Sequence, residues 1–310
     1  MKKTISLMLA GLMLCGALTA CGGNDETGEQ QHGGADAAAD AAADAQPEGG
    51  VSGAITVISR EDGSGTRGAF VELTGVEEKN DAGEKVDNTT ADAEIASKTS
   101  VVLTSVAGNE KAIGYVSLGA LNDTVKALKV DGAEATAEHV KDGSYTLARP
   151  FNIATKGQPT GVAADFMAFI MSADGQQIIE DEGYIKVNDA AEAFKTDGSS
   201  GQIAVGGSSS VSPVMEKLAE AYQAANPNAK IELQESDSTS GMTGAMDGTF
   251  DIGMASRELK EEESAALTGT AIAMDGIAVI VNPANTLEGL SIDQIKSVYV
   301  GDVTEWDELA

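Results

Sequence analysis

A short apolar strand, a turn rich in glycine and serine, and the start of a helix follow one another in Ile55–Phe70, and this pattern constrains the fold most. Ile55–Ile58 has the β-branched and apolar character of a strand. The turn Gly63–Thr66 directs backbone N–H groups, two hydroxyls and the positive end of a helix dipole towards one point, which suits an anion. Arg60 adds a planar set of donors, and Asp62 adds one acceptor. The competing interpretation is an ordinary helix N-cap in which the glycines serve only the turn.

Similar polar loops recur after short strands later in the sequence. They are Gly206–Ser210, Ser238–Gly241 and Ala255–Arg257. Hydroxyl and N–H groups can surround an oxyanion with neutral dipoles, and they then need only one or two full charges. The recurrence therefore favours an oxyanion-binding site over an isolated helix cap.

The order of strands and helical segments predicts an α/β protein. Further strands are expected at residues 112–116, 125–130, 145–151, 203–205, 231–233, 251–253 and 277–281. Apolar residues at helical spacing predict one helix from Gly161 to Gly183, and Ser291 with Gln294 predicts a capping box. We expect residues 77–99 to be loop and partial helix.

The first 50 residues have the composition of a leader and a tether. Residues 1–20 carry Lys2 and Lys3 before an apolar run, which is typical of a secretory signal peptide. The run ends in Leu18–Cys21, which resembles the processing box of bacterial lipoproteins, and this resemblance implies cleavage before Cys21 and lipidation of it. Residues 21–50 are rich in glycine, alanine and carboxylates, and we expect a disordered acidic tether. The alternative is a secreted protein with an incidental cysteine.

The composition argues against several classes of function. A formal net charge of −29 disfavours binding to nucleic acid. No Walker lysine follows the glycines, no G-x-S-x-G motif is present, and no metal-ligand spacing occurs. His139 is the only histidine beyond the tether, and we expect a surface or capping role for it. We therefore expect no catalytic residue, no metal site and no cofactor.

Five stretches occur together in one known family. They are Arg60–Thr66, Gly207–Pro213, Ser238–Gly241, Asp251–Arg257 and Asp275–Ile277. This set resembles the phosphate-binding lipoproteins of phosphate ABC transporters, as do Ala112–Val116 and Arg149–Phe151. The resemblance implies a periplasmic-binding-protein fold of type II, with two α/β lobes, a hinge and phosphate buried between the lobes.

The order of these stretches differs from that of the family. There the loop similar to Gly207–Ser210 comes first, and the loop similar to Arg60–Thr66 comes in the middle. The chain therefore resembles a circular permutant, in which the old ends are joined through Gly198–Gly201. We assign residues 51–151 and 277–310 to one lobe and residues 152–276 to the other, with the hinge near Phe151 and Gly276.

The resemblance also implies which residues contact phosphate. These are Arg60, Asp62, Ser64, Gly65, Thr66, Ser208, Ser209, Ser210, Ser238, Ser256 and Arg257. Some members of the family have Asp at the position of Arg257. Asp62 is then the expected acceptor of the phosphate proton, and it would disfavour sulfate, which offers only lone pairs.

The resemblance implies an extracytoplasmic protein, anchored to the cell membrane by lipid only, that delivers inorganic phosphate to the permease subunits of an ABC importer. We expect a monomer; a dimer that exchanges halves is the alternative. A binder of another oxyanion such as sulfate is the close alternative in function. A surface sensor or adhesion module without transport is an alternative of another class, and a phosphatase is the least favoured, because no base or metal site accompanies the serines.

Overall fold

The computed structural model describes residues 51–309. The predicted signal peptide, the Cys21 lipidation site and the acidic tether lie outside the described residues. Within residues 51–309, none of the helices combines the length and the apolar character needed to cross a membrane.

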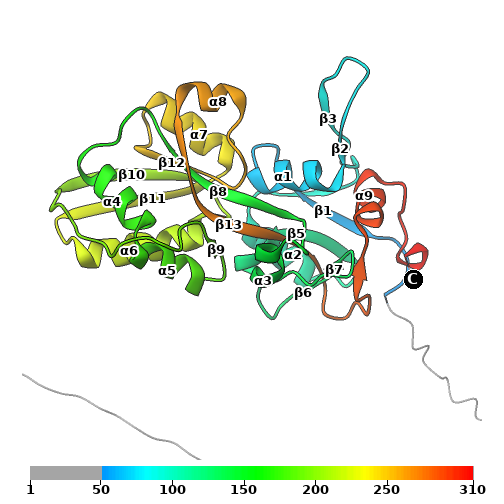
Figure 1. Ribbon diagram of the computed structural model, residues 1–310. Helices are drawn as coiled ribbons and strands as arrows, with labels where there is room; N and C mark the ends of the chain where they lie inside the picture. Colours follow the sequence, from blue (N-terminus) through cyan, green and yellow to red (C-terminus); the bar gives the residue numbers. More distant parts are fainter. Residues whose placement is uncertain (1–50, 310) are drawn as a thin grey trace, which may run out of the picture. The chain divides into compact units, whose positions relative to one another are not determined.

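A mixed sheet of ten strands runs through the described part of the chain (Figure 1). Its strands are β1 (Thr56–Arg60), β4 (Glu94–Ala96), β5 (Ala112–Ser117), β6 (Lys126–Ala127), β8 (Ala148–Thr155), β9 (Ile185–Lys186), β10 (Gly201–Ser208), β11 (Ala229–Ser236), β12 (Ile252–Ala255) and β13 (Thr268–Val281). The strand order is β11-β10-β12-β8-β13-β5-β1-β4, and β6 and β9 also pair with β13. Two small sheets join β2 (Glu77–Lys79) to β3 (Lys85–Asp87) and β7 (Lys129–Val130) to β14 (Gly289–Leu290).

Helices connect these strands and cover the sheet. They are α1 (Gly65–Thr74), α2 (Thr99–Ala107), α3 (Ala137–Asp142), α4 (Gly161–Met171), α5 (Ala173–Asp181), α6 (Ser212–Ala225), α7 (Ser238–Asp247), α8 (Glu261–Ala266) and α9 (Ile292–Val300), with short 3-10 turns η1 (Leu118–Ala120) and η2 (Trp306–Glu308). The predicted α/β class is thus observed.

Strand β13 belongs to two regions with separate cores. Its Thr268–Gly276 part pairs with β8, and its Ile277–Val281 part pairs with β5. One large core packs around Phe166 and Tyr222, and another packs around Phe70 and Tyr299. We call residues 51–147 with 277–309 the first half, and residues 148–276 the second half.

Most of the predicted elements are observed, with shifted ends. The strands predicted at 112–116, 203–205, 231–233, 251–253 and 277–281 lie within or overlap β5, β10, β11, β12 and β13. The predicted capping box of Ser291 and Gln294 is present at α9. The strand predicted over 125–130 is divided into β6 and β7, which pair with different partners.

Three predictions of local structure are wrong. The single helix expected from Gly161 to Gly183 is two helices, because Ser172 leaves the helical conformation and caps α5 by accepting a hydrogen bond from Gly175 N–H. Ser238–Gly241 is the first turn of α7 rather than a loop, and Asp237 caps it. Residues 77–99 contain the β2–β3 hairpin and β4.

Candidate oxyanion-binding site

The turn between β1 and α1 brings hydrogen-bond donors to the seam between the two halves. Ser64 is the N-cap of α1, and its side chain accepts a hydrogen bond from Arg67 N–H. Gly65 then lies so close to the second half that a Cβ atom there would stand 2.4 Å from Ser238 Oγ and 2.8 Å from Ser256 Oγ. Only glycine permits this approach of backbone to hydroxyls.

The second half contributes the ends of neighbouring parallel strands. Strand β10 pairs in parallel with both β11 and β12, so the carboxyl ends of all three meet at one edge of the sheet. Ser208 ends β10, Ser238 begins the helix after β11, and Ser256 directly follows β12. Polar loops that follow separate strands in the sequence therefore converge in space.

These side chains form a buried network that we call the hydroxyl cluster. Its members are Thr66, Thr99, Ser208, Ser209, Ser210, Ser238 and Ser256, all of them buried. Thr66 Oγ1 lies 2.8 Å from Ser210 Oγ, and Ser208 Oγ donates to Ser256 Oγ at 2.9 Å. Thr66 comes from the first half and Ser210 from the second, so the cluster joins the two halves.

Arg60 supplies a buried positive charge to the cluster. Its side chain is 2% exposed, and Glu61 accepts hydrogen bonds from its Nε at 2.8 Å and its Nη2 at 2.7 Å. The remaining donor positions face Ser209 Oγ at 3.1 Å from Nη2 and Thr99 Oγ1 at 3.3 Å from Nη1. Glu61 thus fixes the plane of the guanidinium, which presents its far edge to the hydroxyls.

Two residues of the network were not among the predicted contacts. Thr99 begins α2, and its Oγ1 lies 3.3 Å from Ser209 Oγ and 3.2 Å from Ser210 Oγ. The strand before it, β4, has only three residues and two of them are exposed, so the strand-loop-helix signal that marks the other loops is weak there. Arg149 donates to Thr66 Oγ1 at 3.0 Å, although the sequence had singled it out only as part of a matching stretch.

Asp62, the predicted acceptor of the phosphate proton, does not lie in this cluster. Its side chain is 97% exposed, and its carboxylate pairs with Arg67 at 2.7 Å. Asp62 comes two residues before the N-cap Ser64, and the structure turns its side chain to solvent. The adjacent Glu61, rather than Asp62, is the carboxylate that binds Arg60.

Arg257 borders the cluster, but its charged end is directed elsewhere. Its Nη1 and Nη2 form hydrogen bonds of 2.7 and 2.8 Å with the two carboxylate oxygens of Glu263. Burial acts to raise the pKa of Glu263, but the hydrogen bonds from Arg257 lower it below its usual value overall. In this arrangement the charge of Arg257, a predicted phosphate contact, is paired with Glu263.

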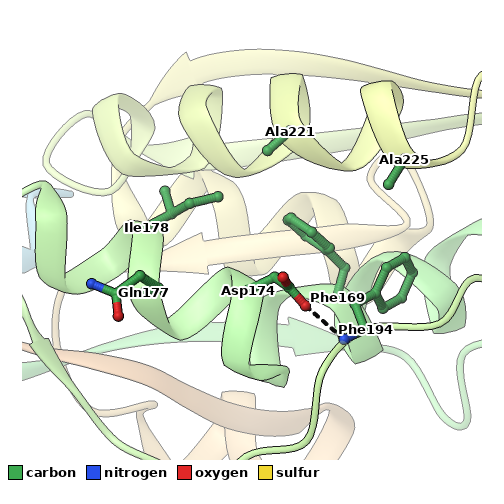
Figure 2. A pocket seen from close by; sticks show the side chains of 7 residues that line it. All are labelled: Phe169, Asp174, Gln177, Ile178, Phe194, Ala221 and Ala225. Carbon is green, nitrogen blue, oxygen red and sulfur yellow. Dashed lines mark hydrogen bonds between the residues drawn. The ribbon is translucent and has the colours of Figure 1, made fainter.

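Two cavities lie outside the cluster. One of about 440 Å³ lies between α5 and α6, and its lining is mainly apolar, with the Asp174 carboxylate accepting a hydrogen bond from Phe194 N–H at 2.6 Å (Figure 2). Another of about 650 Å³ is bordered by Arg149, Arg257 and the exposed side of α1. No residue of the hydroxyl cluster lines either cavity.

Comparison with known proteins agrees with this fold. A family model described as the PBP superfamily domain matches residues 26–174 and 193–310. The phosphate-binding protein PstS 2 of Streptococcus agalactiae serotype V (strain ATCC BAA-611 / 2603 V/R) is 46% identical over 311 residues, which cover 99% of this chain and 98% of that protein. The phosphate-binding protein PstS of Bacillus subtilis (strain 168) is 35% identical over 143 residues, which cover 46% of this chain and 44% of that protein.

A solved structure is also similar. The crystal structure of a phosphate-binding protein of a phosphate ABC transporter from Streptococcus pneumoniae TIGR4 matches with a TM-score of 0.68 and 46% identity, over 83% of this chain and 100% of that chain. The fold is therefore that of the periplasmic-binding-protein superfamily, as predicted. Within it, the chain belongs to the family of phosphate-binding proteins named PstS.

We predict that Thr99→Val weakens oxyanion binding by about tenfold, because it removes one buried hydroxyl and keeps the side-chain shape. Isothermal titration calorimetry with phosphate measures this change. Thr104→Val on the same helix is the matched control, since the Thr104 hydroxyl bonds only to Ser100 C=O at an exposed position. If the two variants bind phosphate equally tightly, Thr99 does not contribute to binding.

We predict that Asp62→Asn changes the affinities for phosphate and for sulfate by less than about twofold, because exposed ion pairs contribute little. Competitive titration of one anion against the other gives the ratio of the affinities. If Asp62→Asn instead lowers the ratio of phosphate affinity to sulfate affinity, Asp62 contributes to the selectivity, as the sequence predicts.

Proposed function

We propose that this protein captures inorganic phosphate in the hydroxyl cluster and delivers it to an ABC importer. The observation that carries the proposal is the position of Arg60, a buried cation whose Nη atoms reach Ser209 and Thr99. The relatives are named as phosphate-binding proteins, which supports phosphate as the ligand. The cluster offers many hydroxyl donors and few charges, a composition suited to binding an oxyanion.

Binding, rather than catalysis, fits the arrangement of the side chains. Two carboxylates beside the cluster are each engaged with an arginine, Glu61 with Arg60 and Glu263 with Arg257. Neither is free to act as a base towards a bound ester. We therefore propose a role without turnover of the ligand.

We also propose where the protein is located and which proteins receive its ligand. The basic, apolar and cysteine-containing beginning of the sequence supports export and lipidation at Cys21. Residues 21–50 would then separate the folded part from the membrane, and permease subunits would receive the phosphate. We propose that β8 and β13, which run side by side and join the two halves, form the hinge for release.

We also propose that the chain is a circular permutant of other family members. The segments 53–55 and 304–307 lie side by side: Ile55 N–H donates to Thr304 C=O at 2.7 Å, and Trp306 N–H donates to Gly53 C=O at 3.0 Å. This adjacency supports an ancestral chain in which residues 304–307 were followed directly by residues 53–55. The single alignment over 99% of the chain indicates that the relative from Streptococcus agalactiae has the same order.

The first test is calorimetric titration with phosphate after unfolding and dialysis remove phosphate carried through purification. We predict one-to-one binding that excess sulfate does not displace. Arg60→Lys should weaken it by about a hundredfold, since Lys cannot make the same set of planar contacts. Absence of binding by the folded protein would favour a sensor or adhesion role, and displacement by sulfate would favour the other oxyanion.

A rearranged chain tests the permutation. It begins at Gly201, continues to Leu309, passes through a short Gly/Ser linker to Gly53 and ends at Ser200. We predict that it folds and that its Kd for phosphate lies within about threefold of that of the natural chain. The new ends, Ser200 and Gly201, are exposed, and the joined segments already lie side by side. Circular dichroism and titration measure the two properties, and a chain that remains unfolded would contradict the proposal.

A further inference from the structure

Arg149 and Asp275 form a buried ion pair where β13 passes from one half to the other. Arg149 on β8 lies directly opposite Asp275 on β13 in the strand register. The side chains are 2% and 0% exposed, and Arg149 Nη1 lies 3.1 Å from Asp275 Oδ2. Burial raises the pKa of Asp275 to about 6, against the opposing effect of Arg149.

The guanidinium of Arg149 contacts both halves of the hydroxyl cluster. Its Nη2 donates to Thr66 Oγ1 at 3.0 Å, on the first half. Its Nε donates to Ser256 C=O at 2.7 Å, on the second half. One rigid planar group therefore fixes the spacing between the Thr66 turn and the loop after β12.

The contact with Thr66 also determines where its hydroxyl proton points. A threonine hydroxyl donates its single proton in one direction and accepts hydrogen bonds at the lone pairs of its oxygen, in other directions. Since Arg149 donates to that oxygen, the proton is directed away from Arg149, towards Ser210, Ser256 or an anion in the cluster. Thr66 is thereby set as a donor, which is the role that an oxyanion requires.

In the second half, Arg149 binds the loop after β12 at Ser256, whose side chain and backbone both take part in the network. Ser256 N–H donates to Ser238 Oγ at 3.1 Å, and Ser256 Oγ accepts from Ser208 Oγ at 2.9 Å. With its carbonyl bound to Arg149, Ser256 has a partner at its N–H, its C=O and its hydroxyl. A shift of Arg149 would therefore move several hydroxyls at once.

We propose that Arg149, held in place by Asp275, is a positioning residue for oxyanion binding that orients Thr66 as a donor and fixes the Ser256 loop against it. This inference rests on the proposed function of the cluster and adds to it a residue that the predicted contacts did not include. Asp275 acts only through Arg149, because its carboxylate pairs with the guanidinium on the side away from Thr66 and Ser256.

The first variant is Arg149→Lys, which keeps the charge beside Asp275 but cannot span Thr66 and Ser256 C=O together. We expect the Kd for phosphate, measured by calorimetry, to rise about tenfold. Lys230→Arg is the control, since Lys230 pairs with Glu232 at an exposed position near the start of β11, and it should change the Kd less than about twofold. Equal Kd values for Arg149→Lys and the natural protein would overturn the inference while leaving the proposed function intact.

A double-mutant cycle separates positioning from general structural support. If Arg149 acts through Thr66, Arg149→Lys should weaken binding at least threefold less in a Thr66→Val background than in the natural one. The same factor in both backgrounds would show that Arg149 does not act through Thr66 and would overturn this part of the inference.

A second variant covers the case in which Arg149→Lys does not fold. Arg149→Met with Asp275→Leu removes both buried charges, an exchange that often preserves stability. We expect a folded protein by thermal unfolding, with a phosphate Kd raised at least about tenfold. A folded double variant with unchanged affinity would overturn the inference, whereas failure of the natural protein to bind phosphate would overturn the proposed function itself.

Discussion

The burial of the Arg60 charge is the constraint on which the candidate site depends. A guanidinium that is 2% exposed requires partners for its donors, because an unpaired buried charge is costly. Glu61 satisfies one edge, and the remaining donors are left to the hydroxyls of Thr99 from the first half and Ser209 from the second. The two halves must therefore meet at Arg60, and the glycine at position 65 permits this approach.

The sequence predicted the convergence of the polar loops better than it predicted the elements around them. Arg60, Thr66 and the serines of the later loops follow apolar strands, so their convergence could be inferred from the topology of parallel strands. Thr99 was missed because β4 is only three residues long and exposed along most of its length. Arg149 was missed as a member of the network because its role depends on the register of β8 against β13, which sequence spacing does not contain.

The positions of Asp62 and Arg257 away from the cluster have a common cause. Asp62 and Arg257 carry charges, and the resemblance gives their positions in the chain but not the directions of their side chains. Each finds an opposite charge on its own half, Arg67 and Glu263 respectively, and turns towards it. Local ion pairs thus determine which charges remain at the cluster.

The course of β13 has a consequence for how the protein unfolds. Its residues Thr268–Gly276 complete the sheet of the second half, and Ile277–Val281 complete that of the first. Melting of either half would remove a hydrogen-bonded neighbour from the other, although the two large cores are separate. Because both halves share strand β13, we expect them to unfold together as one cooperative unit.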